Sequence, residues 1–486
     1  MNLQELLYKV SVAKAVGTTN VEVAGIAFDS RKIKKDFLFV AVKGTQSDGH
    51  TYISQTINAG ATVVILENMP ADLEDNINYI QVEDSNIALG IIAANFYNNP
   101  SEKIKLVGIT GTNGKTTIVS LLSQLFALLN VKVGMLSTIQ NKIIDTIIPS
   151  THTTPDAIQI NFLLNEMISQ GCEYCFMEVS SHAISQGRVS GLNFSGGVFT
   201  NITQDHLDYH NTFAEYRDVK KSFFDVLPKD AFALSNKDDK NSLKMLEGTK
   251  AEKCTYALKS SAEYKCRVLE NQFEGMLLNI NKVDVWVKLI GEFNAYNMLS
   301  VYAVANRFGF EDYEVLTALS MLTAAEGRFQ FLKSEEKITA IVDYAHTDDA
   351  LKNVISTINN IRSNAEHLIT VVGCGGDRDK TKRPLMAAVA CNLSNQVILT
   401  ADNPRSENPD AIIEDMLAGL DPVQKKKVLV ITDRAQAIKT ACRLANTNDI
   451  VLVAGKGHEK YQEINGEKFP FDDLEELKQS LNIIIQ

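Results

Sequence analysis

The stretch Gly108-Ile109-Thr110-Gly111-Thr112-Asn113-Gly114-Lys115-Thr116-Thr117 decides the fold that we predict for this chain. It follows an apolar run at residues 105–110 and precedes a helical pattern at residues 116–129. This strand–loop–helix order is typical of a phosphate-binding loop, in which glycines let the backbone N–H groups and the helix N-terminus surround phosphates. We therefore predict that Lys115 reaches the β- and γ-phosphates of a nucleotide, while the Thr116 hydroxyl binds Mg²⁺.

The loop departs from the strict pattern G-x-x-x-x-G-K-[ST], which requires glycine where this chain has Ile109. The nearest glycines are Gly108 and Gly111. A glycine-rich turn without a ligand is the alternative interpretation. The flanking strand and helix patterns favour the phosphate loop.

Outward from this loop, Val- and Ile-rich runs alternate with helical patterns along nearly the whole chain, which predicts an α/β fold. The length of 486 residues suggests about three domains. We expect a first domain at residues 1–99, a central P-loop domain with a parallel sheet at residues 100–331, and a C-terminal Rossmann-like domain at residues 332–486.

Polar clusters follow the predicted strands of the central and C-terminal regions. These clusters lie at residues 111–117, 180–182, 201–206, 343–349, 373–383, 402–405 and 455–459. In open parallel sheets, ligands bind beyond the carboxyl ends of the strands. We therefore expect the clusters of each region to meet in one site that faces a cleft.

Composition and charge restrict the class of protein. The formal net charge of −11 disfavours a nucleic-acid partner. Cys172 and Cys175 form a C-x-x-C in an apolar run, so we interpret them as buried strand residues rather than a redox or metal pair. The N-terminal sequence MNLQELLYKV is too polar for a signal peptide, and no run of about 18 apolar residues occurs. We expect a cytoplasmic monomer without a membrane span.

The spelling G-T-N-G-K-T-T at residues 111–117 resembles the superfamily of Mur ligases and folylpolyglutamate synthases. Further motifs in the family's order extend the resemblance over essentially the full chain: Thr153-Thr154-Pro155, Glu178-Val179-Ser180-Ser181-His182, residues 201–208, residues 294–297, Glu326-Gly327-Arg328-Phe329, Asp343-Tyr344-Ala345-His346, residues 373–384, Asp402-Asn403-Pro404-Arg405 and Gly455-Lys456-Gly457-His458-Glu459. Together they are most similar to the Mur ligases that add a third residue, meso-2,6-diaminopimelate, to UDP-MurNAc-L-Ala-D-Glu in peptidoglycan biosynthesis.

The resemblance implies that a substrate carboxylate attacks ATP to give an acyl phosphate, and that an amine then displaces phosphate to leave an amide and ADP. Positioning and charge neutralisation dominate such chemistry. The implied catalytic residues are Lys115, Glu178, His206, Lys220 and Arg328. The implied Mg²⁺ ligands are Thr116, Glu178, His206 and Lys220, the last as a CO₂-derived carbamate, because an ammonium cannot ligate a metal. Lys221 is the adjacent alternative to Lys220.

The same resemblance assigns two nucleotide-containing substrates. The implied ATP-binding residues are Gly111, Thr112, Asn113, Gly114, Lys115, Thr116, Thr117, Asn297, Arg328, Asp343 and His346. Asp348 replaces the proline of the family's D-Y-A-H-T-P-D, which changes the stiffness and the charge of this loop. The implied residues for the UDP-linked substrate are Phe28, Ser30, Thr45, Gln46, Ser47, His152, Thr153, Thr154, Ser180, Gln186 and Arg188. A simple turn is the alternative interpretation of Asp29-Ser30-Arg31.

The run Asp402-Asn403-Pro404-Arg405 bears on which amine is added. Diaminopimelate differs from L-lysine by a second amino-acid head, whose carboxylate a guanidinium can bind bidentately. The resemblance assigns this role to Arg405 and has Glu459 accept from the distal ammonium. The rest of the implied pocket is Arg378, Asp402, Asn403, Pro404 and Gly455. A structural salt bridge in a surface loop is the alternative.

Three other functions remain as alternatives. The L-lysine-adding ligase and folylpolyglutamate synthase belong to the same superfamily, but the run at residues 402–405 argues against both. A P-loop protein that uses ATP as a conformational switch is a different class, and it leaves Arg405 and the Glu459 loop without a role. We also expect the nucleotide to lie between the second and third domains, so that rotation of the third domain assembles the site.

Overall fold

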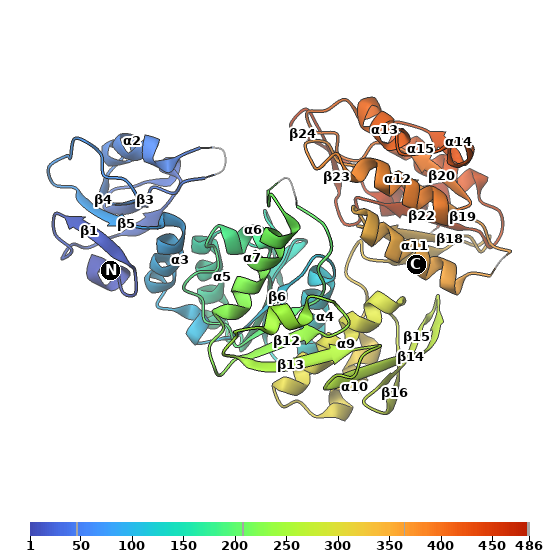
Figure 1. The fold of residues 1–486 in the computed structure, drawn as a ribbon, viewed down its shortest axis with the longest axis horizontal. Helices are drawn as coiled ribbons and strands as arrows, with labels where there is room; N and C mark the ends of the chain where they lie inside the picture. The colour runs from blue at the N-terminus through green and yellow to red at the C-terminus, as the bar shows by residue number, and fades with distance from the viewer. Residues whose placement is uncertain (45–46, 207–208, 364, 484–486) are drawn as a thin grey trace.

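Figure 1 presents the computed structural model, which describes residues 1–44, 47–206, 209–363 and 365–483. Three units lie in an elongated row, with the N-terminal unit at one end and the C-terminal unit at the other (Figure 1). Each unit combines a mainly parallel sheet with helices, so the predicted α/β fold is confirmed. In the described ranges, no helix combines the length and apolar character needed to span a membrane.

The N-terminal unit is built on a five-stranded sheet in the order β1-β5-β4-β3-β2, in which only β1 is antiparallel to its neighbour. Its strands are β1 (Val12–Val16), β2 (Gly25–Ala27), β3 (Phe37–Val40), β4 (Ala61–Leu66) and β5 (Asn78–Val82). Its helices are α1 (Leu3–Leu6), η1 (Ser30–Lys32), η2 (Gly49–Tyr52), α2 (Ile53–Asn58) and α3 (Ser85–Phe96). The sequence did not predict β1, because its side chains are mostly exposed and leave no apolar run.

Helix α3 joins the N-terminal unit to the central unit. Leu89 and Ile92 pack in the core of the N-terminal unit. The opposite face meets the central unit, because a Cβ added at Gly90 would lie 2.6 Å from the carbonyl oxygen of Ser190. This explains why the helix is apolar on nearly all sides, as helices buried on all sides are.

The central unit contains an eleven-stranded sheet in the order β16-β15-β14-β13-β12-β11-β6-β10-β7-β8-β9. The strands are β6 (Lys105–Thr110), β7 (Val133–Leu136), β8 (Gln140–Ile143), β9 (Thr146–Pro149), β10 (Tyr174–Glu178), β11 (Gly196–Phe199), β12 (Phe232–Asn236), β13 (Glu252–Ala257), β14 (Tyr264–Gln272), β15 (Gly275–Ile280) and β16 (Val283–Val287). Strands β7, β10, β6, β11, β12 and β13 form the predicted parallel part. The antiparallel extensions at β8–β9 and β14–β16 were not predicted from the sequence.

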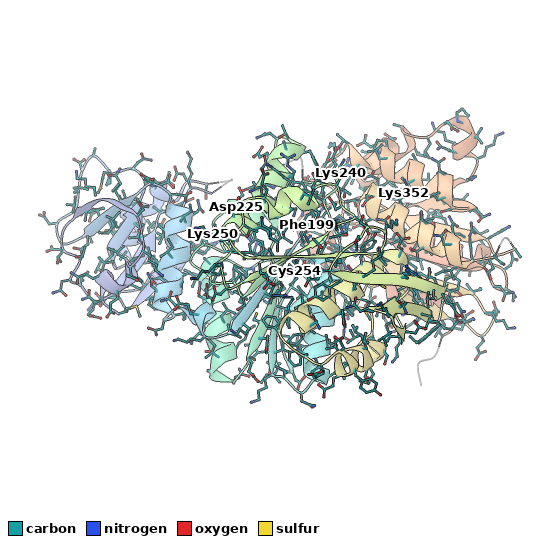
Figure 2. All side chains as sticks on the ribbon, turned by 60° about the horizontal axis from the view of Figure 1, so that its bottom comes forward. Phe199, Asp225, Lys240, Lys250, Cys254 and Lys352 are labelled. Carbon is teal, nitrogen blue, oxygen red and sulfur yellow. The ribbon has the colours of Figure 1, made fainter. Side chains whose placement is uncertain are left out.

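Helices cover both faces of this sheet. They are η3 (Pro100–Glu102), α4 (Lys115–Leu128), α5 (Ala157–Ser169), α6 (Ser181–Ser185), α7 (Phe213–Asp225), α8 (Ser242–Leu246), α9 (Glu292–Arg307) and α10 (Asp312–Met321). One hydrophobic core joins the sheet to α4, α9 and α10, and a second joins it to α5, α7 and α8. Figure 2 labels Phe199 of β11 and Cys254 of β13, two buried residues of these separate cores. The parallel strands are therefore covered on both sides, which leaves their ends as the accessible edges.

The C-terminal unit contains a six-stranded sheet in the order β17-β18-β22-β19-β20-β21, with only β17 antiparallel. Its strands are β17 (Gln330–Lys333), β18 (Thr339–Asp343), β19 (Leu368–Val372), β20 (Gln396–Leu399), β21 (Val428–Val430) and β22 (Ile450–Ala454), and a separate hairpin is β23 (Tyr461–Ile464) and β24 (Glu467–Pro470). Its helices are α11 (Asp348–Ile361), α12 (Lys382–Leu393), α13 (Pro409–Leu417), α14 (Pro422–Lys425), α15 (Arg434–Leu444) and α16 (Asp473–Ser480). This sheet begins at Gln330, two residues before the expected start of the domain at residue 332.

Candidate active site

A cavity of about 900 Å³ lies between the central and C-terminal units. Loops after β6, β10 and β11 line it from one side, and loops after β18, β19, β20 and β22 line it from the other. All seven polar clusters expected at strand ends contribute to this one wall. The predicted site residues in the wall are Thr112, Asn113, Gly114, Lys115, Thr116, His152, Thr153, Thr154, Glu178, Ser180, Arg188, His206, Arg328, His346, Arg378, Asp402, Asn403, Arg405, Gly455 and Glu459.

The phosphate loop turns between β6 and α4, as the sequence predicted. Gly111 and Gly114 have φ angles of +147° and +89°, which residues with a Cβ rarely adopt. The end of β11 holds the loop, because Thr200 Oγ1 donates a hydrogen bond of 2.6 Å to the carbonyl of Asn113. The loop conformation is therefore fixed by the neighbouring parallel strand.

Lys115 is the first residue of α4, and its side chain lies over the loop. Its Nζ donates to the carbonyls of Gly111 at 2.9 Å and Thr112 at 2.8 Å. Burial lowers the pKa of this ammonium. Thr116 faces the cavity, whereas Thr117 is buried in α4 and lies outside the wall.

A carboxylate and an imidazole follow the two strands that flank β6. Glu178 ends β10, is 1% exposed, and accepts a hydrogen bond of 2.7 Å from the backbone N–H of Thr138. The Nε2 of His206 lies 3.6 Å from Asp205, and its ring centroid lies 4.9 Å from that of His182. Burial lowers the pKa of His206 to about 3, so the ring is neutral at pH 7 and has a nitrogen that can ligate a metal.

The side chains predicted to hold Mg²⁺ include a carboxylate, an imidazole and a hydroxyl, which are groups that can ligate a divalent cation. Glu178 is buried, forms no salt bridge with any residue in the described ranges, and acts electrostatically on the ammonium of Lys115. Thr116 and His206 line the same cavity. Across the described residues, no group of three or more His, Cys, Asp or Glu side chains is placed to bind a metal. The predicted set therefore depends on the Thr116 hydroxyl and on Lys220 as well.

Lys220 lies behind the phosphate loop rather than in the cavity wall. It is 1% exposed, its Nζ donates to the carbonyl of Gly111 at 3.0 Å, and it lies 4.6 Å from the ring centroid of Tyr216. Burial lowers its pKa well below the usual value for lysine. Lys221 instead pairs at 2.6 Å with Asp225, a residue labelled in Figure 2. The geometry thus favours Lys220 over Lys221 for chemistry at the loop.

The segment between the central and C-terminal units brings Arg328 to the phosphate loop. Its guanidinium donates to Thr116 Oγ1 at 3.3 Å and lies 4.6 Å from the ring centroid of Tyr344. His346 lines the cavity two residues beyond that tyrosine, and burial lowers its pKa to about 4. The site therefore combines a permanent cation with a neutral imidazole.

Besides Gly111 and Thr117, two further residues predicted to contact ATP lie outside the cavity wall. Asp343 is buried, and its two carboxylate oxygens accept from the backbone N–H groups of Phe329 at 2.7 Å and Ala345 at 2.8 Å. This carboxylate therefore ties the linking segment to the end of β18. Asn297 supports the phosphate loop from α9, because a Cβ added at Gly114 would lie 2.7 Å from its Oδ1.

Four of the central-unit residues predicted to bind the UDP-linked substrate form one hydrogen-bonded group: Thr154, Ser180, Gln186 and Arg188. Thr154 Oγ1 donates to the carbonyl of Glu178 at 2.8 Å and accepts from the N–H of Ser180 at 3.1 Å. Arg188 donates to the carbonyl of Thr154 at 2.8 Å and to Gln186 Oε1 at 2.6 Å. Gln186 thus orients Arg188 from outside the wall, while the other three face the cavity.

The first-unit residues predicted for the same substrate do not reach this cavity. Phe28, Ser30 and Ser47 are absent from its wall, and Thr45 and Gln46 lie outside the described residues. Asp29 caps η1, and its carboxylate accepts from the backbone and the guanidinium of Arg31. The segment at residues 29–31 is therefore a capped turn, and the role of Ser30 in binding the substrate stays a prediction.

The C-terminal residues predicted to bind diaminopimelate gather on one side of the cavity. Arg405 has φ +50°, donates to the carbonyl of Gly376 at 2.7 Å, and has its Nε 3.4 Å from Glu463. Arg378 lines the same wall, so two guanidinium groups face this part of the cavity. Pro404 is not part of the wall.

Amide and carboxylate groups complete this side. Asn403 Nδ2 donates to Glu459 Oε2 at 2.7 Å. Gly455 has φ +118°, and a Cβ there would lie 2.5 Å from Asp402 Oδ2. Glycine at this position therefore leaves room for the Asp402 carboxylate.

The sequence did not single out several residues that the structure places at the site. Tyr344, Lys382 and Tyr461 line the cavity. Lys456 is fully buried behind the wall, and Asp349 contacts the phosphate loop from α11. Each except Tyr461 lies inside a polar cluster at a strand end, so a charged or aromatic residue in such a cluster was the available signal.

Comparisons with known proteins agree with this arrangement. Three family models match: the Mur ligase family catalytic domain at residues 22–97, the Mur ligase middle domain at residues 109–305, and the Mur ligase glutamate ligase domain at residues 327–457. A UDP-N-acetylmuramoyl-L-alanyl-D-glutamate–2,6-diaminopimelate ligase from Cytophaga hutchinsonii is 53% identical over 486 residues, covering 100% of both chains. The ligase of the same name from Phocaeicola vulgatus is 53% identical over 98% of this chain and 99% of its own.

A solved structure of a UDP-N-acetylmuramoyl-L-alanyl-D-glutamate–2,6-diaminopimelate ligase aligns with a TM-score of 0.70 and 32% identity. The alignment covers 99% of each chain, so all three units are shared. This chain belongs to the Mur ligase family.

Proposed function

We propose that this chain is an ATP-dependent, ADP-forming ligase that adds meso-2,6-diaminopimelate to the D-Glu γ-carboxylate of UDP-MurNAc-L-Ala-D-Glu in peptidoglycan biosynthesis. The observation that carries the proposal is the single cavity between the central and C-terminal units. It joins a phosphate loop on one side to Arg405, Asn403 and Glu459 on the other. The full-length relatives that share this fold carry that activity in their names.

The first step joins two anions, the substrate carboxylate and the terminal phosphate of ATP. Lys115 and Arg328 supply positive charge at the phosphate loop, and the loop's N–H groups at the start of α4 add to it. Attack of the carboxylate oxygen on the γ-phosphorus forms an acyl phosphate and releases ADP. The amine then attacks the carbonyl carbon and expels phosphate, leaving the amide.

Thr116, Glu178 and His206 would hold Mg²⁺, which when bound neutralises phosphate charge. Lys220 would carry the carbamate. Its burial favours the neutral amine that reacts with CO₂, and its Nζ is 3.0 Å from the loop carbonyl of Gly111. The carbamate would place an anion directly behind the phosphate loop.

The amine pocket is the part of the cavity lined by Arg378, Asp402, Asn403, Arg405, Gly455 and Glu459. It would distinguish diaminopimelate from L-lysine by charge. Arg405 and Arg378 offer guanidinium groups to the distal carboxylate, which L-lysine lacks. Asp402 and Glu459 offer carboxylate acceptors to the distal ammonium. The carboxylate and the ammonium of the distal head therefore both find partners of opposite charge on one wall.

We assign residues 1–99 to the UDP-substrate domain, residues 100–331 to the ATPase domain, and residues 332–486 to the domain that binds the amine. Phe28, Ser30 and Ser47 would then contact the uridine end of a substrate long enough to reach from the first unit to Thr154 and Arg188.

The seven described cysteines are all free and buried, which supports a reducing cytoplasmic location. We further propose that the chain acts as a monomer.

The test is an amine panel. The purified chain is incubated with ATP, MgCl₂, UDP-MurNAc-L-Ala-D-Glu and meso-diaminopimelate, L-lysine or L-glutamate, and the products are weighed by mass spectrometry. We expect the highest kcat/KM with diaminopimelate. Preference for L-lysine would contradict the substrate assignment, and ATP hydrolysis without any new amide would contradict the ligase itself.

A further inference from the structure

Lys456 is a fully buried lysine behind the part of the cavity lined by Asp402, Asn403 and Glu459, two residues after the end of β22. Its Nζ donates to Asn403 Oδ1 at 2.9 Å and to Glu459 Oε2 at 3.5 Å, and lies 4.0 Å from Asp402 Oδ1. One ammonium therefore contacts three side chains that line the cavity, although Lys456 itself does not line it.

The first consequence is the orientation of Asn403. A lysine ammonium only donates, so it selects the carbonyl oxygen of the amide, and the backbone N–H of Glu463 donates to the same oxygen at 3.0 Å. The amide nitrogen must then point away, where it donates to Glu459 Oε2 at 2.7 Å. Lys456 thus fixes the Glu459 carboxylate both directly and through Asn403.

The second consequence is the charge of the pocket. The side chains of Asp402 and Glu459 are 9% and 17% exposed, so two carboxylates share a poorly hydrated space. Burial, followed by the charge of Asp402, raises the pKa of Glu459, while Lys456 acts in the opposite direction. Lys456 therefore places a cation beside both carboxylates, and the formal charges of these three side chains sum to −1, which suits a cationic ligand.

We propose that Lys456 is a positioning residue for the amine substrate, orienting Asn403 and holding Asp402 and Glu459 as an anionic pair that receives the distal ammonium of a diamino acid. The identity of that amine rests on the proposed function. The placement of Lys456 against these three side chains does not depend on the proposed function.

The test compares Lys456→Met, which keeps the length of the side chain without its charge, with the parent enzyme. We expect the KM for diaminopimelate to rise roughly 10- to 100-fold, as loss of a charged hydrogen bond predicts, and the KM for ATP to change less than about twofold. Lys439→Met is the matched control, because Lys439 is an exposed lysine on α15 of the same unit. An unchanged KM for diaminopimelate in Lys456→Met would overturn the proposal.

A double-mutant cycle separates positioning from a general structural role. In a Glu459→Gln background, we expect Lys456→Met to raise the KM for diaminopimelate by less than about threefold, because the carboxylate that it holds is gone. The same factor in both backgrounds would contradict a positioning role for Lys456.

Thermal melting shows whether each variant is folded, and Lys456→Gln takes the place of Lys456→Met if Lys456→Met is not folded. Loss of folding in both variants would also contradict the proposal, whereas a parent enzyme that forms no amide would contradict the proposed function instead.

Discussion

The side-chain amide of Asn113, in the phosphate loop, donates a hydrogen bond of 3.1 Å to the carboxylate of Asp349, in the first turn of α11. These residues are 236 positions apart, and the bond links the central unit to the C-terminal unit at the edge of the cavity. Thr203 Oγ1 lies 3.5 Å from the same carboxylate oxygen. The C-terminal unit is thus held directly against the loop that is predicted to bind ATP.

We expect Asp349→Ala to lower kcat/KM for ATP roughly tenfold, because loss of the contact loosens the C-terminal unit where the site is assembled. Steady-state kinetics with varied ATP measures this. Asn353→Ala is the control, since Asn353 also contacts Asp349 but from within α11. Equal impairment of both variants, or of neither, would contradict a role for the contact between the units.

Asp348 occupies the position where the family has proline, and the structure shows why either residue is tolerated. It is the first residue of α11, after the N-cap Thr347. Proline suits this position, and the extended backbone of Thr347 at φ −124° and ψ 157° suits a residue before proline. We expect Asp348→Pro to retain activity within about twofold and to stabilise the chain by about 0.4–1 kcal/mol. A clear drop in the melting temperature would show that the aspartate has a role of its own.

Arg405 is held in a left-handed conformation with its guanidinium donating to the carbonyl of Gly376. We expect Arg405→Ala to raise the KM for diaminopimelate roughly 10- to 100-fold with little change in the KM for ATP, because the amine loses a charged partner and ATP does not. Arg443→Ala, at an exposed position of α15, is the control. Comparable initial rates for Arg405→Ala and the parent at limiting diaminopimelate would refute the assignment.

The ion pair between Glu407 and Arg383 is expected to make the stability of the fold fall at acid pH. The hydrogen bonds from Arg383, at 2.8 and 3.0 Å, are the main cause that lowers its pKa to about 2. A folded-state pKa below the ordinary value of 4.5 stabilises the fold above about pH 4.5, and this stabilisation is lost as the pH falls toward 2.

We expect Glu407→Gln to lower Tm at pH 7 by roughly 2–10 °C, and the difference from the parent to shrink at pH 4 and further at pH 3. Thermal melts at the three pH values measure this, with exposed Glu414→Gln as the control. A difference that is the same at all three values would contradict the assigned ion pair.

The local part of the fold could be predicted from the sequence. The phosphate loop and its flanking strand and helix depend on glycines and on apolar periodicity within about twenty residues. The polar clusters at strand ends followed from the same local pattern and a general rule for parallel sheets. By contrast, β14–β16 alternate exposed and buried residues irregularly, so their pairing was not evident from the sequence.

Contacts between distant segments could not be predicted in this way. Asp343 and Glu178 both end buried strands, but only the structure shows that backbone N–H groups occupy both oxygens of Asp343. Lys220 and Lys221 are adjacent in the sequence, and one faces the phosphate loop while the other pairs with Asp225. Which way a helix turns its face, and which groups its neighbours offer, depends on packing across the whole unit.

The most direct test of the central claim follows oxygen from the carboxylate to phosphate. UDP-MurNAc-L-Ala-D-Glu labelled with ¹⁸O in the γ-carboxylate is incubated with the enzyme, ATP, MgCl₂ and meso-diaminopimelate, and the inorganic phosphate is analysed by mass spectrometry. If the carboxylate attacks the terminal phosphate of ATP, each phosphate released carries one labelled oxygen and the new amide keeps the other. Phosphate without label, formed alongside the tripeptide product, would contradict the account.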